Sequence, residues 1–235
     1  MPLPSEAPDL PQRVFSPIAR DYDTPALVLS LFCYRFWHRF LLSRLHLPLG
    51  GRVLDMATGT GTIALDLHQR GVEVVACDVT GAMLRRAQER ADRSDVYLNL
   101  IECTAEAPPF RDSSFDAITF AYLLRYVQDV PGTLKSLGSL LNRGGTMASL
   151  DFAVPRGIWY PLWRLYTAAV LPAGGRLFSR DWQRVGAFLG PNIRDFYDRW
   201  PEERLLSAWR AAGFKNVRLR RLTVGGAVVI WGTKP

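Results

Sequence analysis

One run of the chain, VLDMATGTGTIALDL at residues 53–67, restricts the fold more than any other. Its β-branched and apolar start is typical of a buried strand, and the apolar spacing from Thr62 to Arg70 is typical of a helix that Gly71 ends. Between them lies a Thr-Gly-Thr-Gly turn. Glycine has no Cβ, so such a turn lets backbone N–H groups come close to a ligand. The strand–turn–helix unit therefore predicts a ligand-binding edge of an α/β sheet.

The same alternation of strands and helices continues along the chain. Further strands are predicted at VEVVACD, VYLNLIEC, FDAITFAYLL and TMASLDF, with helices from Thr80 to Arg93 and from about Val130 to Leu141. Two last strands, 216–222 and 227–233, flank Gly225-Gly226 and are expected to form a hairpin. This pattern predicts an α/β fold with a seven-stranded, mostly parallel sheet and helices on both faces.

Two segments lie outside this alternation. Residues 1–17 are Pro-rich and are expected to be a flexible arm, followed by a single domain over residues 18–235. Within it, residues 18–49 are expected to form a helical cap, with one helix from Thr24 to His46. Residues 155–200 are rich in Trp, Tyr, Phe, Pro and Arg, and we expect them to form a helical insert that acts as a lid.

The composition excludes several classes of protein. The net charge of +7 comes almost entirely from arginines, but these are interspersed with acidic residues, which favours a solvated surface over a nucleic-acid site. The longest apolar run is too short to span a bilayer. The three cysteines lack metal-ligand spacing, so no metal site is expected. A cytoplasmic protein, peripheral to a membrane at most, fits these features.

The nature of the ligand follows in part from two aspartates. Asp78 ends the second strand nineteen residues after Gly59, a placement that suits a carboxylate bound to a ribose diol. The ligand is then either a dinucleotide, because residues 59–64 fit G-x-G-x-x-A, or S-adenosylmethionine. Asp55, just before the turn, would repel a pyrophosphate and suit a sulfonium cation. A turn that binds no ligand is the remaining alternative.

A family resemblance favours the second ligand. The segments VFSPIARDYDTPALVLSLFCYRFWHRFL, LDMATGTG, ACDVTGAML, AEAPPFRDSSFD, LLRYVQD and LLNRGG occur in this order, followed by a late AGF. Together they resemble the class I S-adenosylmethionine-dependent methyltransferases. More narrowly, they resemble the ubiquinone/menaquinone biosynthesis C-methyltransferases of the UbiE/MenG type, from Val14 to the end of the chain. The resemblance implies a Rossmann-like methyltransferase fold with S-adenosylmethionine as the cofactor.

The resemblance also implies where the cofactor binds: at the turn, at Asp78 on the ribose, and near the adenine after the third strand. The family usually has Asn or Asp where Thr104 stands, and Ser where Ala121 ends the fourth strand. The expected cofactor-binding residues are Asp55, Thr58, Gly59, Thr60, Gly61, Asp78, Val79, Thr104, Ala105 and Ala121.

Methylation of a phenol ring carbon needs a cation near the phenol oxygen, because the carbon becomes nucleophilic as the phenol loses its proton. Arg125 in LLRYVQD is the candidate for that cation, and the alternative is a helical ion pair with Asp129. The next residue, Tyr126, stands where the family has Asn, and it is expected to be catalytic together with Arg125 and Tyr22. Tyr22 is expected either to close over the cofactor or to anchor the start of a helix. The lone His38 is interpreted as a packed or surface residue rather than a base.

The expected acceptor is a prenylated, demethylmenaquinol-like quinol. The segments FCYRFWHRFL and WYPLWRLYTAAVL would line a channel for its tail or rest on an anionic membrane, unless they form an ordinary lid over a small aromatic substrate. Two other functions stay open: methylation of another aromatic or polyketide-type metabolite at C, O or N, and a catalytically silent ligand-binding module. A homodimer is also compatible with the sequence.

Overall fold

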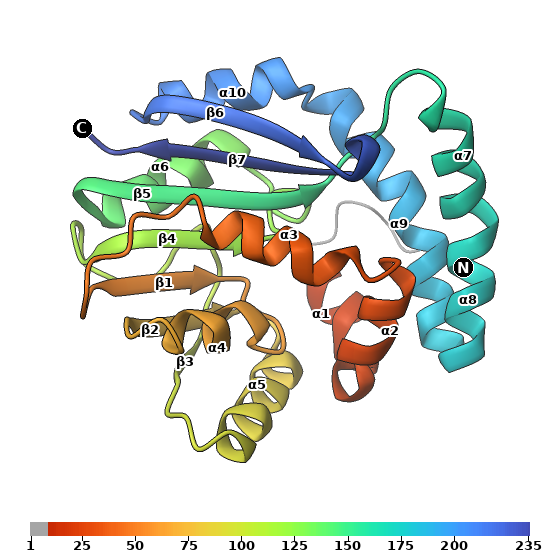
Figure 1. The fold of residues 1–235 in the computed structure, drawn as a ribbon, viewed down its shortest axis with the longest axis horizontal. Coiled ribbons are helices and arrows are strands. Elements are labelled where there is room, and N and C mark those ends of the chain that lie inside the picture. Colours follow the sequence, from red (N-terminus) through yellow and green to blue (C-terminus); the bar gives the residue numbers. More distant parts are fainter. Residues whose placement is uncertain (1–8) are drawn as a thin grey trace.

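The sheet is the centre of the computed structural model, which describes residues 9–235 (Figure 1). Its seven strands have the order β3-β2-β1-β4-β5-β7-β6. The first five pair in parallel, whereas β7 is antiparallel to both β5 and β6, so the hairpin and the mostly parallel sheet are confirmed. The strands are β1 (Arg52–Met56), β2 (Glu73–Asp78), β3 (Asn99–Glu102), β4 (Phe115–Ala121), β5 (Leu141–Phe152), β6 (Lys215–Leu222) and β7 (Ala227–Thr233).

Helices cover both faces of the sheet because successive strand residues point to opposite sides. Val53 packs in a cluster with α3 (Cys33–Leu42), α4 (Thr62–His68) and α5 (Gly81–Arg93). Its neighbour Leu54 packs in a second cluster with α6 (Val130–Leu140) and α10 (Glu202–Ala211). The result is the three-layer arrangement that the sequence predicts.

The N-terminal segment differs from the prediction of a flexible arm. Its described part forms α1 (Leu10–Phe15), followed by the 3₁₀ helix η1 (Ser16–Asp21) and α2 (Asp23–Leu29). Leu10, Val14 and Ile18 are buried against Trp182 and Val185 of the insert, so residues 9–17 are part of a packed cluster. Residues 1–8 of the predicted arm lie outside the described residues.

The predicted helix from Thr24 to His46 is also interrupted. Leu31 and Phe32 have φ angles of 51° and 62°, in the left-handed region that an α-helix cannot contain. Two helices therefore replace the single predicted one, and α3 leaves α2 at an angle. Similarly, β4 ends at Ala121 rather than at Leu124, because Tyr122 has a φ of 60°.

The insert is helical, as predicted. It comprises α7 (Trp159–Leu165), the π-helix η2 (Tyr166–Val170), α8 (Leu171–Phe178) and α9 (Arg180–Arg199). Backbones of α8 and α9 are in close contact: a Cβ on Gly186 would lie 2.5 Å from the Leu171 carbonyl oxygen. In Figure 1 these helices and α1–α2 lie beyond the carboxyl ends of the parallel strands.

Across residues 9–235, we find no helix with the length and apolar character needed to cross a membrane.

Candidate active site

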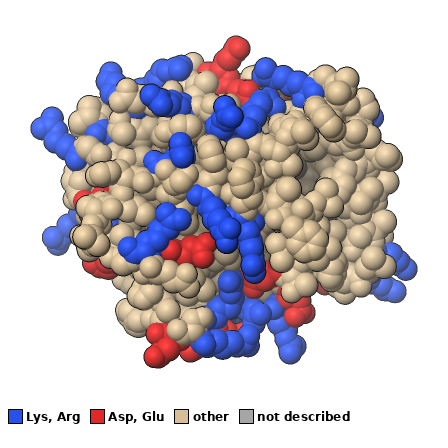
Figure 2. All heavy atoms as spheres, in the orientation of Figure 1, with Lys and Arg blue, Asp and Glu red and all other residues tan. Residues whose placement is uncertain are grey.

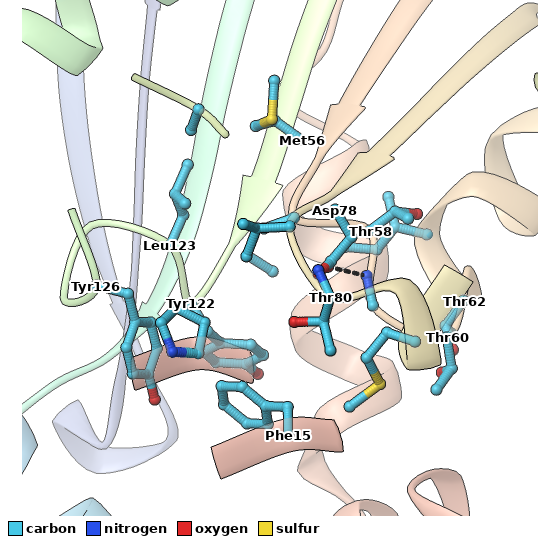
Figure 3. A pocket seen from close by; sticks show the side chains of 18 of the residues that line it. Phe15, Met56, Thr58, Thr60, Thr62, Asp78, Thr80, Tyr122, Leu123 and Tyr126 are labelled. Carbon is cyan, nitrogen blue, oxygen red and sulfur yellow. Dashed lines mark hydrogen bonds between the residues drawn. The ribbon is translucent and has the colours of Figure 1, made fainter. Parts of the chain in front are cut away.

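A cavity of about 150 Å³ lies at the carboxyl ends of β1, β2, β3 and β4 (Figure 3). Its walls come from the turn after β1, from the residues that follow the other three strands, and from α1 and α3. This is the edge at which open α/β sheets bind ligands. The sequence-predicted residues that line it are Thr58, Gly59, Thr60, Asp78, Val79, Thr104, Ala105 and Ala121.

The glycine turn is fixed to β2 by Asp78. One carboxylate oxygen of Asp78 accepts a hydrogen bond from the Gly59 N–H at 2.8 Å, and the other accepts one from the Thr80 N–H at 2.8 Å (Figure 3). Gly59 and Gly61 have φ angles of 56° and 78°, which favour glycine. A Cβ on Gly59 would meet no atom within 4 Å, so this side of the turn is open to a ligand.

Asp55 lies beneath the turn, which differs from the prediction of a charge facing the ligand. Its carboxyl group is buried, accepts a hydrogen bond of 2.6 Å from the Thr58 hydroxyl, and does not line the cavity. Burial raises the pKa of Asp55 to about 7. Gly61 does not line the cavity either. The argument that the Asp55 charge selects a sulfonium therefore fails, and both residues support the shape of the turn.

Asp23 of α2 is hydrogen-bonded to the turn, a contact that the sequence does not predict. The Thr60 hydroxyl donates to the Asp23 carboxylate of α2 at 2.7 Å. Arg90 of α5 donates to the same Asp23 oxygen at 2.9 Å and to the hydroxyl of Thr62 at 2.8 Å. Because Thr60 uses its hydroxyl in this network, its side chain holds α2 against the turn.

A second, mostly apolar cavity of about 430 Å³ adjoins the first, between α2, α3 and the insert. Tryptophans from α3, α7 and α9 are among its lining residues. Five aromatic residues line both cavities: Phe15, Tyr22, Tyr34, Tyr122 and Tyr126. These shared walls place a large apolar space directly beside the smaller cavity at the strand ends.

Arg125 is a buried cation in the wall of the second cavity. Its Nε donates to the Asp151 carboxylate at 2.7 Å, and its Nη1 donates to the Asn192 side-chain oxygen at 2.6 Å. Burial alone would lower the pKa of Arg125, but the charge and hydrogen bond of Asp151, together with Tyr126 and Tyr197, outweigh it and the pKa is raised. The alternative pairing with Asp129 is wrong, because Asp129 instead caps α6 through the Gly132 N–H.

The two predicted tyrosines lie where the cavities meet. Tyr126 is close to the guanidinium, with the Arg125 Nη1 3.4 Å from its hydroxyl oxygen, and its ring packs edge-on against Phe15. Tyr22 packs between Phe15 and Trp182. Burial raises the pKa of both phenols, so both stay protonated near neutral pH.

Phe15 and Asn192 are site residues that the sequence analysis missed. For Phe15 a signal existed: Leu10, Val14 and Ile18 recur at a spacing of four, the pattern of a helix with one buried face. For Asn192 we see no such signal, because its partner Arg125 is 67 residues away.

The lining of the smaller cavity fits S-adenosylmethionine. Asp78 suits a ribose diol, and the open side of Gly59 allows close approach of a ligand. The lining residues include Asp78 and Glu106 but, in the part of the chain that the structure describes, neither Lys nor Arg, which a pyrophosphate would favour. The fold and this cavity define a class I S-adenosylmethionine-dependent methyltransferase.

Comparison with known proteins assigns the family. The sequence profile of the ubiE/COQ5 methyltransferase family matches residues 7–234. The chain is 37% identical to the ubiquinone/menaquinone biosynthesis C-methyltransferase UbiE of Xylella fastidiosa (strain 9a5c), over 92% of this chain and 86% of the relative. It is 35% identical to UbiE of Stenotrophomonas maltophilia (strain R551-3), over 93% of this chain and 87% of that relative. The chain belongs to the ubiE/COQ5 methyltransferase family.

Solved methyltransferase structures have the same fold. A solved S-adenosylmethionine-dependent methyltransferase of Thermotoga maritima superposes with a TM-score of 0.66 at 20% identity, over 95% of this chain and 99% of that chain. Family and fold together confirm the predicted methyltransferase activity, the predicted cofactor and the predicted family.

Proposed function

We propose that this enzyme methylates a ring carbon of a quinol that carries a long apolar tail, such as a demethylmenaquinol. The observation that carries the proposal is the second cavity: a large apolar space with one buried, paired guanidinium in its wall. A quinol ring with its oxygen toward Arg125 and its tail among the aromatic residues matches that distribution of polarity.

Each protein group then has a defined part in the chemistry. S-adenosylmethionine supplies an electrophilic methyl group when bound. Arg125 stabilises the developing negative charge on the phenol oxygen, which raises the nucleophilicity of the ring carbon. Within residues 9–235 its hydrogen bonds use Nε and Nη1, so Nη2 is the atom offered to the acceptor. Tyr22 and Tyr126, being protonated, act as hydrogen-bond donors and walls rather than as bases, so the proton that the methylated ring carbon loses would pass to water.

The rim of the second cavity supports a membrane as the source of the acceptor. Leu31, Trp159, Leu162 and Val224 both line the cavity and are exposed at 42–65% of their surface. Figure 2 shows that the surface over α7 and α8 is largely free of charged side chains, whereas Lys and Arg side chains are frequent over the rest of this face. An apolar rim beside cations fits a face that rests on an anionic membrane while a lipid enters the cavity.

The acceptor is tested by incubating the full chain with isotope-labelled S-adenosylmethionine and demethylmenaquinols of increasing tail length. We expect label on the quinol ring, with kcat/KM rising as the tail lengthens, by about 0.8 kcal/mol of binding per buried CH₂. Equal rates for all tails would contradict the proposed tail channel. Label only on aromatic compounds without a tail would contradict the quinol assignment.

The membrane face is tested separately with vesicles of phosphatidylglycerol and of phosphatidylcholine. We expect Leu162→Glu to weaken binding to the anionic vesicles about tenfold, because a buried leucine contributes about 1.5–3 kcal/mol. Leu49→Glu is the control, since Leu49 is exposed just before the amino end of β1. Equal losses in the two variants would contradict a specific membrane face.

A second acceptor class has its own support. Where the family has Asn after the arginine this chain has Tyr126, which lines both cavities, and Ala121, which replaces a serine, lines the smaller one, so the walls near the proposed acceptor differ from the family pattern. A small aromatic or polyketide-type acceptor is therefore the second candidate, which the same panel detects. A homodimer and a cytoplasmic, membrane-peripheral location stay predictions.

A further inference from the structure

Within residues 9–235, the side chain of His38 has no hydrogen-bond partner. It belongs to α3, is 3% exposed, and lines the smaller cavity. Among the described residues, neither of its ring nitrogens makes a hydrogen bond. Buried polar groups in native proteins are nearly always hydrogen-bonded, and an unpaired one costs about 1–3 kcal/mol. An unpaired imidazole in a cavity wall therefore indicates a ligand atom that completes it.

The position of His38 indicates which part of the cofactor that atom belongs to. The strand order places Thr104-Ala105 after β3, Asp78 after β2 and Ala121 after β4. With the adenine near β3 and the ribose at Asp78, the methionyl part lies toward the end of β4. Helix α3 packs on that side: its Trp37 and Leu41 share a cluster with Ile63 and Ala121.

The charge of the cavity lining also favours a carboxylate beside His38. The methionyl part of S-adenosylmethionine carries a carboxylate, which needs donors or a cation. Asp78 and Glu106 are the acidic residues of the described lining, and His38 is its one basic side chain. Hydrogen bonds to a charged group contribute about 1.5–3 kcal/mol, more than neutral ones do.

We propose that His38 binds the methionyl carboxylate of the cofactor through a ring N–H. His38 would then determine cofactor specificity, because it favours a ligand that carries the methionyl carboxylate over one that lacks it. The inference rests on the cofactor and does not depend on which acceptor the enzyme methylates.

The surroundings of His38 keep its ring neutral, so only a ligand would favour the protonated form. Tyr34 lies one turn before it on α3, with ring centroids 4.0 Å apart, and the hydroxyl of Tyr122 is likewise unpaired. Burial by itself lowers the pKa of His38 to about 3, so the ring is neutral without a ligand. A carboxylate placed beside it favours the protonated form.

The test compares two ligands by calorimetric titration of the full chain: S-adenosylmethionine and its decarboxylated form. The wild-type protein is expected to bind the carboxylate-bearing cofactor about 10- to 100-fold more tightly. His38→Ala is expected to lose most of that preference by weakening only the binding of S-adenosylmethionine. His38→Gln, which keeps an N–H donor, should retain part of it.

His46→Ala, which removes an exposed histidine just beyond the same helix, is the matched control and should leave both affinities unchanged. Thermal unfolding shows whether each variant is folded. The proposal is overturned if folded His38→Ala binds both ligands as tightly as the wild type does, or loses affinity for both equally. Binding is the readout throughout, so a failure to methylate quinols would leave this result intact.

Discussion

The smaller cavity, which we propose as the cofactor side, and the second cavity, proposed as the acceptor side, are built in different ways. On the cofactor side, backbone groups at strand ends and a turn are fixed by short hydrogen bonds, as in the bonds of Asp78 to Gly59 and Thr80. On the acceptor side, aromatic side chains from separate helices surround a cavity almost three times as large. Strained backbone adjoins that cavity at Leu31 and Val224, with φ angles of 51° and 49°.

The difference matches what each side has to recognise. An adenosyl group has fixed hydrogen-bonding positions, which preorganised backbone groups can meet. A long apolar tail has none, so it needs volume and apolar surface more than geometry. The predictions that follow test whether the two sides are separable, beginning with the largest expected effect.

Removal of Arg125 should affect the acceptor side alone. For Arg125→Ala we expect kcat to fall about 10²- to 10³-fold, since a preorganised group that stabilises transition-state charge is worth that much. Cofactor affinity by calorimetry should stay within about twofold. Because the variant leaves Asp151 unpaired, Arg125→Lys is the folded control, with an intermediate rate. Full turnover in a folded Arg125→Ala protein would remove the catalytic assignment.

Removal of the Asp78 charge should affect the cofactor side alone. Asp78→Asn keeps the size of the side chain but removes its negative charge, which weakens the proposed hydrogen bonds from the ribose hydroxyls. We therefore expect cofactor binding to weaken about 10- to 100-fold. Calorimetry with S-adenosylmethionine measures it. Glu73→Gln, at the exposed start of the same strand, serves as control. Unchanged affinity in Asp78→Asn would show that the ribose binds elsewhere.

Close packing of the insert should make it sensitive to a single methyl group. In Gly186→Ala the new Cβ would lie 2.5 Å from the Leu171 carbonyl oxygen. Overpacking costs about 1–3 kcal/mol, or roughly 2–4 °C of Tm per kcal/mol in a chain of this size. Ala187→Leu adds bulk at the exposed neighbouring position and should leave the Tm nearly unchanged. An equal Tm for Gly186→Ala would contradict rigid contact between α8 and α9.

The buried carboxyl beneath the turn should give the cofactor side a pH dependence. The pKa of Asp55 is raised from 3.8 to about 7, so between these values the folded state binds more protons than the unfolded state. Its contribution to stability is therefore complete below pH 3.8 and is lost as the pH rises to 7, by up to about 1.4 kcal/mol per pH unit.

Asp55→Asn removes that titration. The difference in Tm between variant and wild type should therefore increase in favour of the variant from pH 4 to pH 7. Taking the difference matters because His38, whose pKa is lowered, contributes with the opposite sign in both proteins. A pH-independent difference would mean that Asp55 is ionised throughout.

The smallest expected effect tests backbone strain on the acceptor side. Phe32 has a φ of 62° and is 67% exposed, so Phe32→Gly relieves strain at little cost in packing. We expect stability to rise by about 0.5–1 kcal/mol. Phe36→Gly, an exposed position inside α3, should instead destabilise, because glycine is unfavourable in a helix interior. A Tm decrease in both variants would contradict the strain.

The cofactor side could be predicted from the sequence because it is local. The strand, the glycine turn and Asp78 follow from patterns within a few residues of each other, and the order of parallel strands brings their ends together. The role of Asp55 was predicted wrongly for a physical reason. Asp55 is close to the turn in sequence. Because side chains alternate between the two faces of a strand, however, its carboxyl group is buried beneath the turn and does not face the cavity.

The acceptor side could be predicted only in outline. The composition of residues 155–200 indicates a helical, aromatic insert, but the partners across it are distant in sequence. Arg125 pairs with Asp151 and Asn192, and α1 is ordered by its burial against α9. Neither follows from local propensity. The break at Leu31-Phe32 does not follow from local propensity either, since Leu and Phe both suit a continuous helix.

The short helix α2 touches both ligand sites. Asp23 at its start holds the cofactor turn through Thr60, and Leu29 at its end lines the acceptor cavity and accepts a hydrogen bond from Tyr166. Seven residues of helix span only about 10 Å, so displacement at one end is transmitted to the other. Binding of the methyl donor at the glycine turn would thus change the shape of the second cavity. Steady-state kinetics should therefore show a compulsory order, in which the methyl donor binds first and the lipid second.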